Sequence, residues 1–145
     1  MARIEHSIEI KRTPDKVFAF VTDPKSWPRW NPDMLEAVQT SSGPATVGAT
    51  FRGANKVMGL RMPWTAKATE YVPNKKWGET ITLGSTVLEE HLAFDPAGAG
   101  TKFTAVFDVK VGGFLRLFAP LMMSSMRKGM KKSQSTLKSI LESQV

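Results

Sequence analysis

Two glutamates have the spacing best suited to acid–base chemistry in this sequence. Two alternating runs, residues 76–83 and 86–94, flank Gly84-Ser85, a dipeptide typical of a two-residue hairpin turn. Counting outward from this turn places Glu79 directly opposite Glu90, on the face that otherwise carries mostly apolar side chains. Burial and like-charge repulsion both raise a carboxyl pKa, so we expect one of the two to keep its proton near neutral pH. The pair predicts a polar anchor, or a general acid and base, in an apolar pocket.

Two other interpretations of this pair remain open at the sequence level. Both carboxyls would stay ionised if they lay at a wet cavity mouth. They would also stay ionised if they paired with Arg52, Arg61 or Lys67 from other strands.

His6 is the third candidate for proton transfer, because it falls on the inner face of the first predicted strand. The alternative is a core histidine with its hydrogen bonds satisfied. We expect no metal and no cofactor. The sequence has no cysteine, no His-x-x-x-His spacing, no Gly-x-Ser-x-Gly turn and no phosphate-binding or dinucleotide-binding glycine motif.

Large apolar residues fall on the faces that would surround the glutamate pair. Methionine is frequent among them, and its flexible thioether adapts to ligands of varied shape, although it also fills gaps in ordinary cores. The residues predicted to contact a ligand are Met58, Met62, Trp64, Trp77, Ile81, Leu88, Phe94, Phe103, Phe107, Phe118, Met122, Met126 and Met130.

The elements that must position these residues follow from periodicity. Apolar residues alternate in the first strand, residues 4–10, and two short helical segments follow at 13–21 and 23–32. Six further strands are predicted, at residues 35–40, 46–52, 61–71, 76–83, 86–94 and 103–110. A loop at 53–59 is expected to cover the pocket mouth. A helical stripe from Leu115 to Leu141 closes the chain, so the class is α+β: a curved antiparallel sheet of about seven strands around a long C-terminal helix.

Bulk composition sets limits on the class of protein. The 145 residues suit one domain, 1–145, and the N-terminus lacks a signal peptide, so we expect a cytoplasmic protein. The net charge of +7 is concentrated in the final helix, at Arg127, Lys128, Lys131 and Lys132. This helix is expected to make transient contact with an anionic membrane or partner protein, or else to be a solvated surface. No nucleic-acid-binding signature is present, and the oligomeric state stays open.

Several segments together resemble the START-like superfamily, in particular its polyketide cyclase/dehydrase and lipid-transport branch. The resemblance rests on residues 8–10, 13–20 and 23–32, followed in order by Gly48-Ala49-Thr50-Phe51, Tyr71-Val72-Pro73, Gly100-Thr101 and the amphipathic C-terminal helix. It implies a helix-grip fold, as in START and Bet v 1-like proteins. In this fold a bent sheet grips the C-terminal helix and leaves a deep hydrophobic cavity between them.

The function that we predict from the sequence is binding or transport of a hydrophobic small molecule in that cavity, such as a lipid, a sterol-like compound or a polyketide. The alternative is a cyclase or dehydratase that uses Glu79, Glu90 or His6 to move protons during ring closure or water loss. The sequence shows no array of cavity arginine, tyrosine and serine that matches the aromatase/cyclase members.

Overall fold

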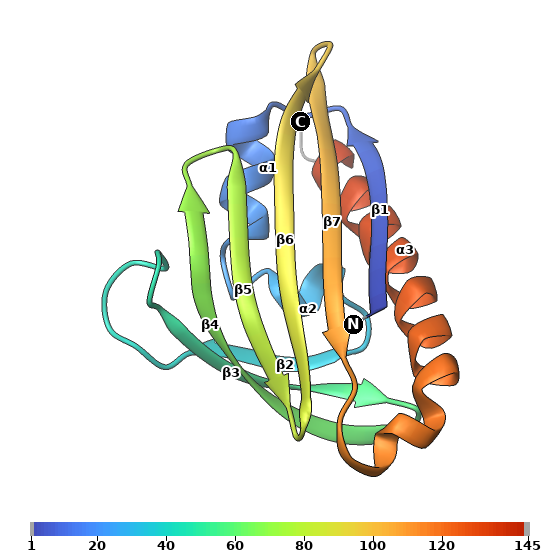
Figure 1. Ribbon diagram of the computed structural model, residues 1–145. Coiled ribbons are helices and arrows are strands. Elements are labelled where there is room, and N and C mark those ends of the chain that lie inside the picture. Colours follow the sequence, from blue (N-terminus) through green and yellow to red (C-terminus); the bar gives the residue numbers. More distant parts are fainter. Residues whose placement is uncertain (1, 144–145) are drawn as a thin grey trace.

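The computed structural model describes residues 2–143, apart from the side chain of Phe114, and confirms the predicted α+β class. The elements in chain order are β1 (Ala2–Ile10), α1 (Pro14–Val21), α2 (Trp27–Trp30), β2 (Met34–Gln39), β3 (Thr50–Val57), β4 (Leu60–Val72), β5 (Lys76–Leu83), β6 (Thr86–Ala97), β7 (Gly100–Lys110), a 3₁₀ turn (η1, Gly113–Phe118) and α3 (Ala119–Ser143) (Figure 1).

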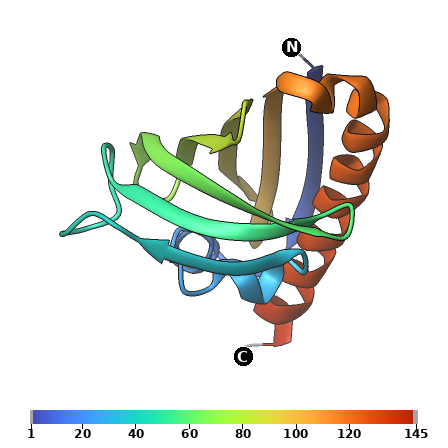
Figure 2. The same ribbon diagram turned by 90° about the horizontal axis from the view of Figure 1, so that it is seen from below.

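The strands form one antiparallel sheet in the order β1-β7-β6-β5-β4-β3-β2. Turns of a few residues join neighbouring strands from β3 to β7. The last strand, β7, also pairs with the first strand, β1. The sheet curves strongly, with α3 beside the β1 end and strands β2 to β4 forming the opposite arm (Figure 2). The curvature leaves a concave face with α1 and α2 at one end of it.

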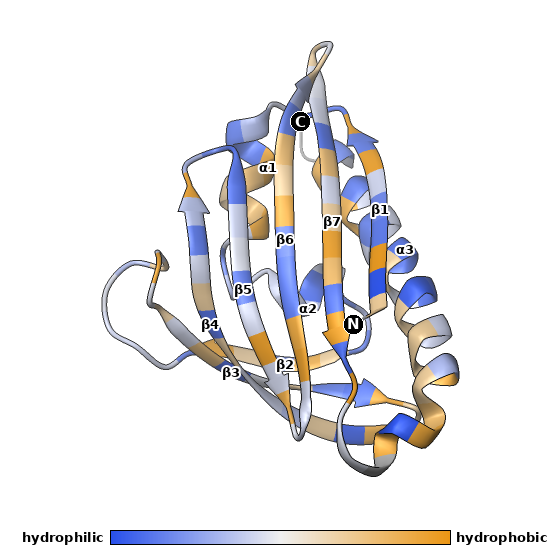
Figure 3. Cartoon of the chain, in the orientation of Figure 1, coloured by the Kyte–Doolittle hydropathy of each residue, from blue (hydrophilic) through white to orange (hydrophobic). Residues whose placement is uncertain are grey.

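Alternation along the strands decides which residues face the core. In β4 the buried residues are Trp64, Ala66 and Ala68, and the residues between them are exposed. The same two-residue period is visible along β1 as alternating orange and blue, and a hydrophilic segment interrupts the middle of β6 (Figure 3). The hairpin register is confirmed: Leu83 pairs with Thr86 and Glu79 with Glu90, on the two strands that flank Gly84.

The segment predicted as a loop at 53–59 is instead the end of β3 and a tight turn, so that prediction was wrong. The turn is Met58-Gly59, and both residues have positive φ, 52° and 85°. Gly53 misled the sequence-based prediction because glycine often ends a strand. Here it permits a close approach, since a Cβ at this position would overlap the indole ring of Trp64.

The helices close the concave side of the sheet. In α1, Pro14 occupies the first turn, and Val17, Phe18 and Val21 are buried. The long helix α3 begins at Ala119, directly after η1, and packs mainly along β1. Its buried residues are Met122, Met123, Met130, Gln134, Leu137 and Leu141. Across the described residues, 2–143, no helix is both long and apolar enough to cross a membrane.

Candidate functional site

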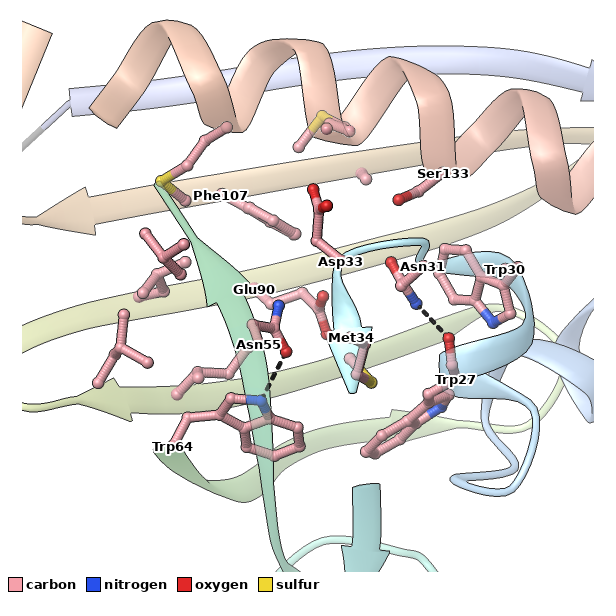
Figure 4. Close-up of a pocket in the computed structure, with 18 of the residues that line it drawn as sticks. Trp27, Trp30, Asn31, Asp33, Met34, Asn55, Trp64, Glu90, Phe107 and Ser133 are labelled. Carbon is pink, nitrogen blue, oxygen red and sulfur yellow. Dashed lines mark hydrogen bonds between the residues drawn. The ribbon is translucent and has the colours of Figure 1, made fainter. Parts of the chain in front are cut away.

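A cavity of about 220 Å³ lies between the concave face of the sheet and α3. Side chains from α2, β3, β6, β7 and α3 converge on it (Figure 4). Its outer rim includes Asp33, Lys56 and Met58, which are exposed, so this side is the mouth. Its inner wall is formed by the central strands, where Trp77, Leu88 and Phe103 are buried.

Most of the residues predicted from the sequence to contact a ligand lie in this wall. Apart from Met58, which lies in the β3–β4 turn at the rim, they share an inward position on a strand or on the inner stripe of α3. They are Met58, Trp64, Trp77, Ile81, Leu88, Phe103, Phe107, Met122, Met126 and Met130, together with Glu79 and Glu90.

Three of the predicted apolar contacts lie elsewhere. Phe94 is buried beyond the cavity, where its ring packs against Phe18 and Phe103 with centroid distances of 5.1 and 5.3 Å. Phe118 ends η1 and is 45% exposed on the outside of the molecule. Met62 is half-buried near the β3–β4 tip and is not part of the cavity wall. Strand parity alone placed Phe94 and Met62 on the correct face, but parity does not say how far the cavity extends along that face.

His6 also lies outside the cavity wall, contrary to the prediction that it reaches the same space. Its Nδ1 lies 2.6 Å from Oε1 of Gln134, and Nε2 of Gln134 donates to the backbone oxygen of His6 at 2.8 Å. Gln134 is only 1% exposed. The half-buried His6 and the buried Gln134 therefore form a clamp between β1 and α3, which corresponds to the alternative of a satisfied core histidine.

Several cavity residues were missed by the sequence analysis. The largest are Trp27 and Trp30 of α2, which pack against Phe51 and Phe103 and also line the cavity. Their spacing of three residues indicates that both lie on the same, buried side of a helical turn. The sheet curvature that brings α2 over the cavity cannot be predicted from neighbouring residues. The other missed lining residues are Val21, Asn31, Asp33, Met34, Asn55, Lys56, Val57, Leu83, Leu92, Ala105, Ser125, Gly129, Ser133 and Gln134.

Glu79 and Glu90 face each other on adjacent central strands and both line the cavity. Burial raises the pKa of Glu79 well above its ordinary value, and the neighbouring Glu90 carboxyl raises it further. Burial also raises the pKa of Glu90, to about 7. The directions of these effects place a proton on Glu79, which shares it with Glu90. The pair therefore begins to ionise near pH 7, and above this pH it carries a single negative charge.

The alternative that arginines neutralise this pair is wrong. Arg61 and Arg52 instead approach Oε1 of Glu36, at 3.1 and 3.8 Å, on the outside of the sheet. Lys67 is exposed and pairs across β4 and β5 with Thr80. Within residues 2–143, no ion pair involves either cavity glutamate.

The other polar groups of the wall are mostly engaged with one another. Asn55 Oδ1 accepts a hydrogen bond from the Trp64 indole at 2.8 Å, and Asn31 Nδ2 donates to the backbone oxygen of Trp27 at 2.9 Å. In contrast, two atoms of the wall are buried without a partner: Oε2 of Glu79 and the indole Nε1 of Trp30. No group of three histidine or acidic side chains that would hold a metal ion occurs in the described part of the chain.

Comparisons with known proteins agree with this geometry. Residues 1–142 match the family described as "Polyketide cyclase / dehydrase and lipid transport". Among solved structures, a START superfamily protein from Mycobacterium smegmatis is similar at a TM-score of 0.82, with 14% identity over 99% of each chain. The protein TTHA0849 from Thermus thermophilus reaches 0.81, with 15% identity over 95% of each chain. No curated protein matches the chain.

Proposed function

The chain belongs to the polyketide cyclase/dehydrase and lipid transport family, and from that premise we propose that it binds or carries a hydrophobic small molecule in the cavity under α3. The observation that carries this proposal is the cavity itself, about 220 Å³ in volume and walled mainly by apolar and aromatic side chains. Ligand sites are typically concave, mostly apolar and supplied with few polar groups. A lipid, a sterol-like compound or a polyketide would meet these conditions.

The four tryptophans provide a direct assay, because the sequence contains four and all of them line the cavity. Titration with an apolar ligand should change the intrinsic fluorescence in a saturable way, and native mass spectrometry after mild purification should show a bound or co-purified molecule. Unchanged fluorescence with a panel of apolar ligands, and a bare mass, would refute the proposal.

A matched pair of variants tests the location. Ala105 lies on β7 with its side chain in the cavity wall, and Ala105→Phe would fill part of the space. Val106 is the next residue and faces the other side of the sheet. Ala105→Phe should weaken binding at least tenfold, which is about 1.4 kcal/mol. Val106→Phe should bind as the unmodified protein does.

A second candidate function is proton transfer, which the Glu79–Glu90 pair favours. A buried carboxyl pair with one proton holds both an acid and a base at neutral pH, as ring closure or water loss requires. Glu90→Gln should then abolish turnover of a candidate poly-ketone substrate and leave its binding intact. Turnover that persists in this variant would exclude the carboxyl pair as the catalytic group.

Contact with a membrane or partner protein is a further part of the proposed role. Arg127, Lys128, Lys131 and Lys132 are all exposed on α3. Apolar side chains are exposed near the start of the same helix, at Leu117 and Leu121. Co-sedimentation with vesicles should increase with their content of anionic lipid, and equal binding to neutral vesicles would argue against this contact. The cytoplasmic location stays a prediction.

A further inference from the structure

Among the residues that the structure describes, the inner part of the cavity holds two carboxyl groups and no cationic side chain. Four charged residues line the cavity among those that the structure describes: Asp33, Lys56, Glu79 and Glu90. Asp33 and Lys56 are exposed at the mouth, where solvent screens them. The two glutamates lie on the central strands β5 and β6, away from this rim. A ligand that fills the cavity therefore meets carboxyl groups at its inner end.

One of these carboxyl oxygens lacks the hydrogen bond that a buried acceptor normally has. Glu79 is only 6% exposed, and its Oε2 has no partner. Leaving a buried acceptor unsatisfied is unfavourable, so such an atom in a cavity wall points to a donor that comes with a ligand. Asn31, Asn55 and Gln134, the side-chain amides that line the cavity, make the hydrogen bonds described above and none to Oε2 of Glu79.

We infer that the cavity takes an apolar molecule whose polar end is a protonated amine, held by the facing carboxyls of Glu79 and Glu90. This inference rests on the proposed function, because it specifies the ligand of the same cavity. An ammonium group offers three donors and no acceptor. It satisfies Oε2 of Glu79 and pairs with the charge on the glutamates, and the apolar remainder of the ligand lies against the tryptophan and methionine side chains.

Other polar ends fit this site less well. A carboxylate would bring a second negative charge beside the pair, and like charges at close range in a buried site repel strongly. An alcohol supplies one donor but no charge, so the charge on the pair would stay uncompensated. Among ligands with the same apolar tail, the charge of the polar end should therefore determine the order of affinity.

Three probes with the same tail test this order: octylamine, octanol and octanoate, each below its micelle-forming concentration or, for octanol, its solubility limit. Their affinities would be measured at neutral pH by tryptophan fluorescence and calorimetry. We expect octylamine to bind at least about tenfold more tightly than octanol, and octanoate to bind most weakly. In Glu79→Gln/Glu90→Gln the three affinities should lie within about threefold of one another, whereas Glu89→Gln should keep the full preference. Glu89 is the matched control because it lies beside Glu90 on the opposite face, where Thr80 Oγ1 donates to its carboxylate at 3.3 Å.

The possible outcomes separate this inference from the proposed function. Octanol binding without a preference for octylamine, or octanoate binding as tightly as octylamine, would overturn the inference and leave the proposed function standing. An amine preference that survives unchanged in the double variant would also overturn it, because the carboxyl pair would not be its cause. Absence of binding by all three probes would overturn both. Octanol affinity in the double variant reports whether the cavity is intact.

Discussion

Replacing both cavity glutamates by glutamine should make the protein more stable in alkaline solution and should flatten part of its pH dependence. The folded state favours the protonated carboxyls, because burial raises the pKa of both glutamates and the neighbouring Glu90 raises the pKa of Glu79 further. Below the ordinary pKa near 4.5, the folded and unfolded chains are equally protonated at these positions and the pair has no effect on the pH dependence. As the pH rises, the unfolded chain loses these protons first, so the free energy of unfolding falls until the pH exceeds the folded pKa values.

The size of this fall follows from the pKa of Glu90. A rise from the ordinary 4.5 to about 7 corresponds to roughly 3 kcal/mol in total. Between pH 5 and pH 8 the part due to Glu90 is roughly 2 to 3 kcal/mol. Glu79, whose pKa is raised well above its ordinary value, increases the fall further. Asp15, Asp108 and Glu142 have lowered pKa values and lose their stabilising effect in acid, below this range.

The assay is urea unfolding at pH 5 and pH 8, with the free energy obtained by linear extrapolation. The unmodified protein should lose at least roughly 2 kcal/mol more than Glu79→Gln/Glu90→Gln over this interval. Glu89→Gln, on the outer face of the same strand, should behave as the unmodified protein does. An equal fall in the unmodified protein and the double variant would refute the reasoning, because the pair would then titrate alike in the folded and unfolded states.

Three further substitutions test how the fold around the cavity is held together, each by urea unfolding at pH 7. Gln134→Leu removes the clamp on His6 and should lower the free energy of unfolding by about 1–3 kcal/mol, since buried polar groups lose their partner. Gly53→Ala should lower it by about 1–3 kcal/mol, because the new methyl group overlaps the Trp64 ring. Gly129→Ala should raise it by about 0.5–1 kcal/mol, because glycine is unfavourable inside a helix and the nearest atom to the new methyl group is 3.9 Å away.

Each of these three predictions has a result that would contradict it. Ser135→Leu adds the same side chain at an exposed position next to Gln134 and should leave stability nearly unchanged. A comparable loss in both variants would show that the clamp contributes nothing. Unchanged stability in Gly53→Ala would contradict the steric overlap with Trp64, and a loss in Gly129→Ala would contradict the open space at that position.

The order of elements and the facing of the glutamates were predictable because both depend on local patterns. Period-two alternation identified the strands, and the Gly84-Ser85 turn fixed the register that sets Glu79 opposite Glu90. The helical stripe identified α3 through the spacing of Met122 and Met130. These signals lie within a few residues of one another in the sequence, so long-range packing does not alter them.

The extent of the cavity was not predictable, because it depends on how far the sheet bends. Phe94 and Phe103 share a face and pack against each other, yet only Phe103 reaches the cavity. Whether His6 would meet the glutamates depended on its partner, Gln134, which lies more than a hundred residues away in the sequence. The role of Gly53 likewise depended on a tryptophan from the next strand. Contacts between residues that are far apart in the sequence are set by tertiary packing, and a local periodicity does not predict them.

The turn at the tip of the β3–β4 hairpin has a consequence for how the entrance is maintained. Met58 adopts φ of 52°, a left-handed conformation that costs an L-residue about 1–2 kcal/mol. Asparagine or glycine would relax the backbone here, but neither would present a flexible thioether to an incoming molecule. Met58 is thus kept in a strained backbone conformation, and its side chain borders the cavity mouth. The strain indicates that position 58 is occupied by methionine for its side chain at the mouth, and not for its ability to form the turn.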